Sequence, residues 1–161
     1  MTRLWTLITA MSACLWAACG GPCDASGLAA GEITAQVDGA AWQGGAATWG
    51  MAGSSLQLNS ASAGDWWLSA VAQETVDGLD LEAALASLPA EIELAPDGLT
   101  GWATFYPASG DSFSTKQASG GLLVLDAVEG GELTGCLSFT AADASGAEVV
   151  VREGRFKAVE R

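Results

Sequence analysis

Residues 121–160 read GLLVLDAVEG GELTGCLSFT AADASGAEVV VREGRFKAVE, and this stretch decides the fold class. Apolar and polar side chains alternate along it in four runs, which is the pattern of β-strands with one buried face. Short segments that contain glycine separate the runs and suit tight reversals of the chain. The stretch therefore predicts an antiparallel meander of four strands: Leu122–Val128, Glu132–Ala141, Ala147–Val151 and Arg155–Val159.

Upstream residues repeat the same alternation in shorter runs. In the clearest of them Ile33, Ala35 and Val37 face one way, and the pair Asp38-Gly39 ends the run as a turn. Further strands are predicted at residues 41–51, Ser55–Ser60, Asp65–Gln73, 92–94 and Leu99–Tyr106. Many short strands with glycine turns predict an all-β fold, an antiparallel β-sandwich, with a small β-barrel as the alternative.

One segment breaks the period of two. Its apolar residues recur at spacings of three and four, the periodicity of an amphipathic helix: Leu81, Ala84, Leu85 and Leu88. Asp80 precedes them as an N-cap, and Pro89 follows as a helix terminator. We predict one short helix over Asp80–Leu88 that covers an end or an edge of the β-fold.

The first nineteen residues have the layout of a secretory signal peptide. Arg3 gives a positive start, Leu4–Ala18 carries no charge, and two small residues precede Cys19. The uncharged run is shorter than the roughly 20 residues that span a membrane. We therefore predict a cleaved signal helix over residues 1–18.

The end of this segment resembles the lipobox of bacterial lipoproteins, whose cysteine receives diacylglycerol and becomes the new N-terminus. The resemblance implies that Cys19 is acylated and anchors the protein in a membrane. Gly20, in place of an aspartate, implies the outer membrane. The sequence departs from the family pattern at Trp16, where an aliphatic residue is usual. Cleavage at Cys14, and a periplasmic or secreted protein without lipid, are the alternatives.

The C-terminal layout is similar to that of small uncharacterised bacterial lipoprotein domains. The similarity covers residues 120–158 and consists of alternating strands and glycine turns. It implies a small all-β domain and no particular activity. The sequence is thus divided into a signal peptide (1–18), a flexible tether (19–31) and a β-sandwich domain (32–161).

The composition is strongly acidic, and the charge is unevenly distributed. Without Arg3, five bases face nineteen acids, which gives a net charge of −14. All five bases lie from Lys116 onward. Such a chain repels phosphate backbones, which argues against nucleic acid as a partner, and the excess of carboxylates favours a soluble monomer.

Two cysteines remain once Cys19 is acylated. Exported proteins reach oxidising compartments in which disulfides are stable, so a disulfide between Cys23 and Cys136 is one prediction. Cys136 shares the polar face of its strand with Thr134 and Ser138, where it could meet the N-terminal segment on the outside of the sheet. A free thiol on a half-exposed strand is the alternative.

The sequence offers little catalytic chemistry. It contains no histidine, which excludes Ser-His-Asp and Cys-His catalysis and any His-ligated metal site. The glycine pairs lack the context of phosphate-binding loops, and no calcium-loop pattern occurs, so we predict no cofactor and no metal. A pair of carboxylates acting across a sugar cleft, as in an envelope hydrolase, is the enzymatic alternative.

Five tryptophans belong to the predicted domain, and most of them are expected in its core. Trp102 and Tyr106 share one face of their strand with Thr104, opposite Phe105. They predict a surface aromatic patch that stacks on a sugar ring or on a partner protein. Packing in the core or under the helix is the alternative.

Three functions follow from these observations. The first is a lipid-anchored, non-catalytic envelope lipoprotein with a structural or interaction role, whose partner is a protein or a glycan. The second is a lipocalin-like β-barrel whose aromatic residues line an apolar cavity for a small ligand. The third is the envelope hydrolase, which would need two acids with perturbed pKa values in a cleft.

Overall fold

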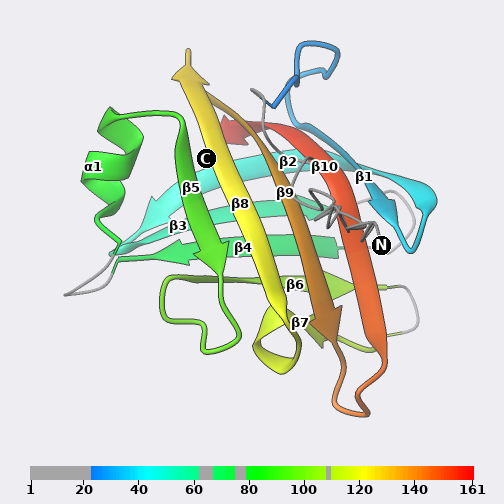
Figure 1. Cartoon of the computed structure of the whole chain (residues 1–161). Helices are drawn as coiled ribbons and strands as arrows, with labels where there is room; N and C mark the ends of the chain where they lie inside the picture. Colours follow the sequence, from blue (N-terminus) through cyan, green and yellow to red (C-terminus); the bar gives the residue numbers. More distant parts are fainter. Residues whose placement is uncertain (1–22, 62–66, 75–78, 108–109) are drawn as a thin grey trace, which may run out of the picture.

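The computed structural model describes residues 23–61, 67–74, 79–107 and 110–161 (Figure 1). The predicted signal peptide, Cys19 and the first part of the predicted tether lie outside these residues. The elements are β1 (Glu32–Val37), β2 (Ala40–Ala52), β3 (Ser55–Ala61), β4 (Trp67–Gln73), α1 (Leu81–Ala86), β5 (Ala90–Leu94), β6 (Gly101–Tyr106), β7 (Phe113–Ser114), the 3-10 turn η1 (Thr115–Gln117), β8 (Gly120–Glu129), β9 (Glu132–Ala142) and β10 (Glu148–Glu160).

The strands form a closed barrel. β1 pairs with β10 on one side and with β2 on the other, and β2, β3, β4 and β6 follow as neighbours. β7 closes the ring, because Phe113 and Ser114 pair with β6 while Ser114 also pairs with Ala142 of β9. The predicted all-β antiparallel fold is confirmed, and of the two predicted architectures the structure has the barrel, with eight strands in the ring.

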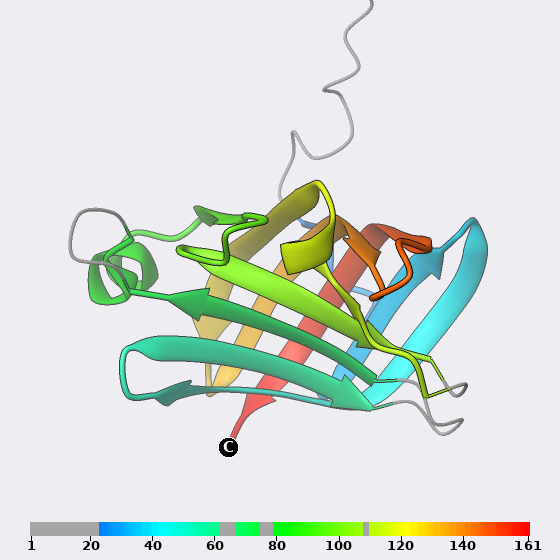
Figure 2. The ribbon, with the colours of Figure 1, turned by 90° about the horizontal axis from the view of Figure 1, so that it is seen from below.

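The barrel is flattened, so that it shows two layers when seen from below (Figure 2). One layer contains β3, β4 and β6, and the other contains β8, β9 and β10. β8 and β5 extend the second layer beyond β9, and the Thr100 hydroxyl donates to the Glu93 carbonyl at 2.9 Å where β5 approaches the start of β6.

The short helix lies beside β5 (Figure 1). The Asp80 carboxylate caps it by accepting a hydrogen bond from the Ala83 backbone N–H at 2.8 Å, as the sequence predicted. Leu81 is fully buried, and Leu85 and Leu88 pack against the core. The helix ends at Ala86, two residues before the predicted end.

The C-terminal meander contains three strands, whereas four were predicted. Val151 and Gly154 both pair with β9, and the two residues between them form a bulge within β10. Glu153 is one of these two residues, and its backbone has a positive φ of 51°. Gly154 then passes so close to Leu137 that a Cβ would lie 2.7 Å from its carbonyl oxygen. The pair Glu153-Gly154 therefore bends one strand and does not separate two.

Apolar side chains from both layers fill the interior as one cluster. Its largest fully buried members come from nine elements: Phe105, Phe156, Ile33, Leu56, Leu58, Leu68, Leu81, Ile92, Leu94, Leu123, Leu125 and Leu133. Trp49 lies inside, with its indole N–H donating to the Gly131 carbonyl at 3.1 Å. Trp42 contacts Phe105 edge to face, with the ring centroids 6.0 Å apart.

The predicted tether differs from the structure in its second part. Residues 23–31 lie on the outside of the second layer, where Ala25 is buried. Gly31 continues the β-pairing, because its N–H donates to Lys157 and its carbonyl accepts from Ala47. These contacts and the disulfide of Cys23 hold this part of the segment against the barrel.

Candidate functional site

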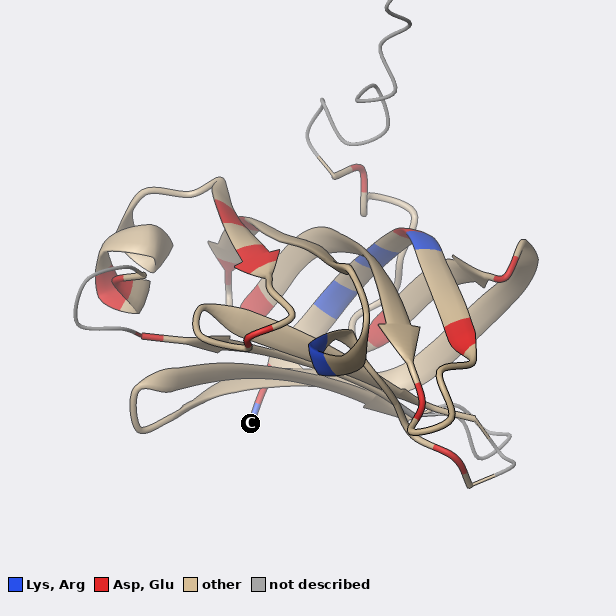
Figure 3. Cartoon of the chain, turned by 60° about the horizontal axis from the view of Figure 1, so that its bottom comes forward, with Lys and Arg blue, Asp and Glu red and all other residues tan. Residues whose placement is uncertain are grey.

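The outward side of β3, β4 and β6 is the most unusual surface of the described chain. Its side chains alternate with buried core residues and carry no charge: Ser55, Gln57, Asn59, Ser69, Val71, Gln73, Trp102, Thr104 and Tyr106. We call these nine residues the uncharged face. The strands that carry it are free of acidic and basic residues along their lengths (Figure 3).

Charged side chains lie outward on several other strands. β5 exposes Glu91 and Glu93, and β10 carries Arg152, Arg155 and Lys157 (Figure 3). In a chain with a net charge of −13, β3, β4 and β6 thus present a surface without a carboxylate, and the neighbouring strand β2 likewise carries no charged residue.

The strand register arranges the uncharged face in rows. Gln57, Val71 and Trp102 lie opposite one another across the three strands. Asn59 and Ser69 form the next row together with Thr104. Because neighbouring strands are about 4.8 Å apart, the side chains of a row are in contact distance of one another.

Hydrogen bonds orient the two central amides of this face. A guanidinium can only donate, so the Gln57 atom that Arg161 contacts at 2.7 Å is its amide oxygen. The Ser69 hydroxyl donates to the Asn59 amide oxygen at 3.0 Å. Each amide oxygen thereby accepts one hydrogen bond from the protein, which orients the NH2 group of the same amide.

Two cations flank the uncharged face, one at each side. Lys116 places its ammonium 3.7 Å from the centroid of the Trp102 ring, a cation–π contact. Its side chain also packs against Gly98, where any side chain would collide with it. On the β2 side, Arg161 packs over Gly50 and its backbone N–H donates to the Trp49 carbonyl at 3.1 Å.

A buried threonine positions Lys116. Thr115 is fully buried, and its hydroxyl accepts a hydrogen bond from the Ala103 backbone N–H of β6 at 3.1 Å. The η1 turn is thereby held against the strand that carries Trp102. The turn falls in the stretch 107–121, where the sequence shows no regular pattern, so sequence reasoning missed Lys116.

The predicted aromatic pair lies on the uncharged face. Trp102 and Tyr106 are both half-buried and point outward from β6, two strand repeats apart. Lys116 lies over the Trp102 ring, a contact that no local sequence pattern predicts. The sequence could have suggested the face itself, since the alternation already placed Gln57 and Asn59 outward.

The predicted cysteine pair lies on the opposite layer. Cys23 and Cys136 are joined by a disulfide, with their Cα atoms 5.4 Å apart. Both are buried and pack with Val124 and Leu122 on the outside of the sheet. The N-terminal segment covers Cys136 there, on the polar side of its strand.

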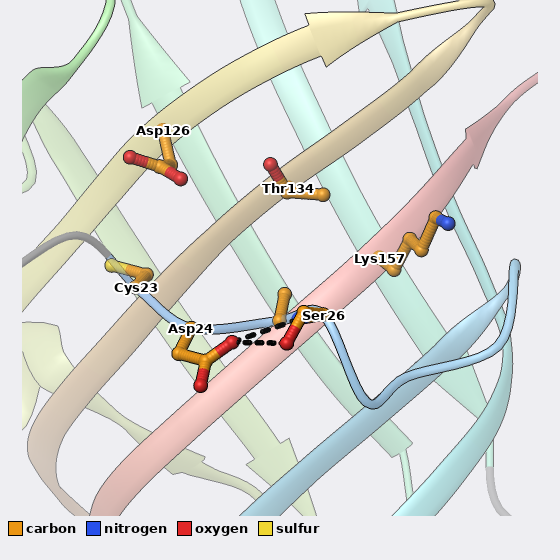
Figure 4. A pocket seen from close by; sticks show the side chains of 7 residues that line it. Cys23, Asp24, Ser26, Asp126, Thr134 and Lys157 are labelled. Atoms are coloured by element: carbon orange, nitrogen blue, oxygen red, sulfur yellow. Dashed lines mark hydrogen bonds between the residues drawn. The ribbon is translucent and has the colours of Figure 1, made fainter.

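An open depression of about 510 Å³ lies next to this disulfide (Figure 4). It is lined by the following residues: Cys23, Asp24, Ala25, Ser26, Asp126, Thr134 and Lys157. Lys157 is already paired with Glu132 at 3.0 Å, and Asp24 accepts from the hydroxyl and the N–H of Ser26. These internal bonds leave the depression a weaker candidate than the uncharged face.

The carboxylates with altered pKa values do not suit acid catalysis. The Ser26 hydroxyl holds the pKa of Asp24 below its ordinary value, and hydrogen bonds led by the Ser145 hydroxyl do the same for Asp143. A catalytic general acid needs its pKa raised instead. Within the described ranges, no three acidic or cysteine side chains converge as metal ligands would.

No membrane-spanning helix was found in the described part of the chain, since none there is both long and apolar enough.

The chain matches no protein-family model, no curated protein and no solved structure. The class that its fold defines is a closed, eight-stranded, mostly antiparallel barrel with one apolar core cluster.

Proposed function

We propose that this protein is a lipid-anchored, non-catalytic module of the bacterial cell envelope that holds a partner through the uncharged face. The observation that carries the proposal is the absence of charge from nine outward positions in a chain of net charge −13. Protein recognition surfaces are depleted of charge at their centre and enriched in aromatic residues, and Trp102 and Tyr106 supply the latter. The membrane anchor rests on the lipobox-like segment that ends at Cys19.

The single apolar core cluster is the reason for preferring this function to a lipocalin-like one. A carrier of small apolar ligands needs a cavity of about 300–1,000 Å³ inside the barrel. Here Phe105, Phe156 and their neighbours from both layers meet in one packed cluster. The lowered pKa values of Asp24 and Asp143 likewise give no support to a hydrolase.

The test is photo-crosslinking in cells at opposite sides of the barrel. A photoreactive amino acid at Ser69 or Thr104 probes the uncharged face, and the same residue at Thr34 of β1 is the control. We expect crosslinked products of higher mass at Ser69 and Thr104 only. Equal products at Thr34, or none at any position, would contradict the proposed contact face.

The anchor is tested separately by the mass of the protein purified from membranes. We expect residues 19–161 plus acyl chains. An unacylated chain would remove the anchor from the proposal and leave the contact face to be judged by the crosslinking result.

A further inference from the structure

Resting on the lipid anchor of the proposed function, we infer that the outer surface of β8, β9 and β10 is the side of the protein that faces the lipid headgroups. The Cys23–Cys136 disulfide and the short chain between Cys19 and Cys23 fix this orientation. The uncharged face, on the opposite layer, then points away from the membrane and toward its partner.

The anchored chain joins the barrel in the middle of this outer surface. Cys23 is bonded to Cys136 of β9, and β9 lies between β8 and β10. Figure 4 shows the segment that follows Cys23 crossing outside β9 and β10. Ala25 is buried there, and the Arg155 guanidinium donates to the Asp24 carbonyl at 3.5 Å.

The chain between the anchor and the disulfide is very short. Four peptide units separate Cys19 from Cys23. Even when fully extended they span at most about 14 Å. An acylated Cys19 lies at the level of the headgroups, because its acyl chains are buried in the bilayer. The outside of β9 therefore stays close to the membrane surface.

The uncharged face is out of reach of the membrane on such a tether. The two layers of a flattened barrel are about 10 Å apart. The Cα atom of Cys23 lies a further 5.4 Å from that of Cys136, on the outer side. To bring the uncharged face to the headgroups, the tether would have to cover this depth and also pass round an edge of the barrel. A reach of about 14 Å does not suffice.

The disulfide is the bond that keeps the tether short. Regular backbone pairing begins only at Gly31, whose N–H donates to the Lys157 carbonyl at 2.7 Å. If residues 23–30 came away from the sheet, the chain from Cys19 to Gly31 would span up to about 42 Å. The barrel could then turn over. The covalent bond to Cys136 prevents this detachment.

The charges of this outer surface are compatible with a position near headgroups. It holds three cations on β10, which lie beside acidic residues: Arg152, Arg155 and Lys157. Lys157 pairs with Glu132 at 3.0 Å. Acylation supplies the attachment to the membrane, and the cations reduce the repulsion between the acidic protein and lipid phosphates.

The experiment places a fluorescent amino acid at one of two matched serines in the full-length, acylated protein. Ser138 is a half-buried residue of β9 that shares the outer surface with Cys136, and Ser69 belongs to the uncharged face. The protein is reconstituted into phosphatidylcholine vesicles whose headgroups carry a nitroxide quencher. We expect the fluorophore at Ser138 to be quenched. The fluorophore at Ser69 should keep the intensity that it has in vesicles without the quencher.

Two variants test the cause of the orientation. The double variant Cys23→Ala, Cys136→Ala removes the disulfide. A ten-residue Gly-Ser insertion after Gly20 keeps the disulfide and lengthens the tether by up to about 35 Å. Quenching at Ser69 should appear in both variants. The same insertion after Gly53, in the exposed turn between β2 and β3, leaves the tether unchanged and should leave Ser69 unquenched.

Thermal unfolding establishes that each variant is folded, and the insertion after Gly20 keeps the test valid if the protein without the disulfide does not fold. Equal quenching at Ser138 and Ser69 in the parent protein, or stronger quenching at Ser69, would overturn the inference. An unquenched Ser69 in a folded variant with the lengthened tether would overturn it too.

The mass of the purified protein separates this inference from the proposed function. An acylated protein with equal quenching at both serines overturns the orientation and leaves the anchor and the contact face standing. An unacylated chain overturns the anchor and the orientation together, and the crosslinks at Ser69 and Thr104 still decide the contact face.

Discussion

At the scale of single residues, Thr115 is the internal support of the uncharged face. It is one of two buried polar residues in the described core, and its hydroxyl satisfies the Ala103 N–H. A buried donor without a partner costs about 1–3 kcal/mol. The hydroxyl therefore stabilises the barrel and at the same time holds the turn that carries Lys116.

Replacing Thr115 by valine keeps the shape and removes the acceptor. We expect Thr115→Val to lower the free energy of unfolding by about 1–3 kcal/mol, measured by urea denaturation. Thr104→Val, the same change at a half-exposed position of β6, is the control and stays within about 0.5 kcal/mol. Equal effects of the two variants would contradict the role of the buried hydroxyl.

At the scale of elements, the β9–β10 hairpin is organised by one carboxylate. Asp143 accepts from the Ser145 hydroxyl at 2.7 Å, from the Ser145 N–H at 2.8 Å and from the Ala147 N–H at 2.9 Å. These bonds, led by that of the hydroxyl, favour the ionised form and lower the pKa of Asp143. The hairpin that begins the last strand is therefore stabilised by a charged group.

Because its pKa is lowered, Asp143 stabilises the folded protein to an extent that depends on pH. A carboxylate whose pKa is lower in the folded than in the unfolded state stabilises the fold at every pH above its pKa in the unfolded state. This stabilisation is lost as the pH falls through the pKa of the folded state. We expect Asp143→Asn to lower the melting temperature at pH 7 and to match the parent protein well below pH 4. Ser145→Ala removes the leading hydrogen bond and reduces this pH dependence. A pH-independent difference for Asp143→Asn would contradict the argument.

The disulfide joins the N-terminal segment to β9 over a sequence separation of 113 residues. A bridge that closes so long a loop restricts the unfolded chain, and its loss typically costs about 2–5 kcal/mol. We expect this loss for the Cys23→Ala, Cys136→Ala double variant in urea denaturation. Mass spectrometry of the parent protein checks the bridge: alkylation after reduction adds two groups more than alkylation before it. The absence of additional alkyl groups after reduction would contradict the disulfide. An unchanged denaturation midpoint of the double variant would contradict its stabilising effect.

Some of these elements could be predicted from the sequence, and others could not. The alternation of Ile33, Ala35 and Val37, and the capping position of Asp80, are local signals that survive in the fold. The bulge at Glu153 has the composition of a turn, and only its pairing with β9 shows otherwise. For the candidate site, the alternation within the predicted strand Ser55–Ser60 places Gln57 and Asn59 on the face opposite Leu56 and Leu58, whereas Lys116 and Arg161 reach the face through long-range packing.

At the scale of the whole molecule, the choice between sandwich and barrel depended on pairings that no local pattern encodes. Both architectures have the same alternation along each strand. Two sets of pairings close the barrel. β1 pairs with β10 and with β2, and the two residues of β7 connect β6 with β9. Each brings together segments that are far apart in the sequence.

The filled barrel predicts how the whole molecule responds to a cavity. Phe156 is fully buried, and Phe156→Ala should lower the free energy of unfolding by about 3–5 kcal/mol. An apolar cavity of this origin stays dry and takes up benzene, whereas the parent protein should take up none. Saturable uptake of an apolar probe by the parent protein would instead favour the small-ligand carrier.

The pairing of β1 with β10 also bears on when the chain can fold. The two strands lie at opposite ends of the described chain, so the ring cannot close until β10 has been synthesised. Closure of such a long loop is entropically costly and slow, because non-local contacts form only after that entropy is lost. A chain of this topology therefore completes its barrel only after its last strand has been made, whichever strands have paired before.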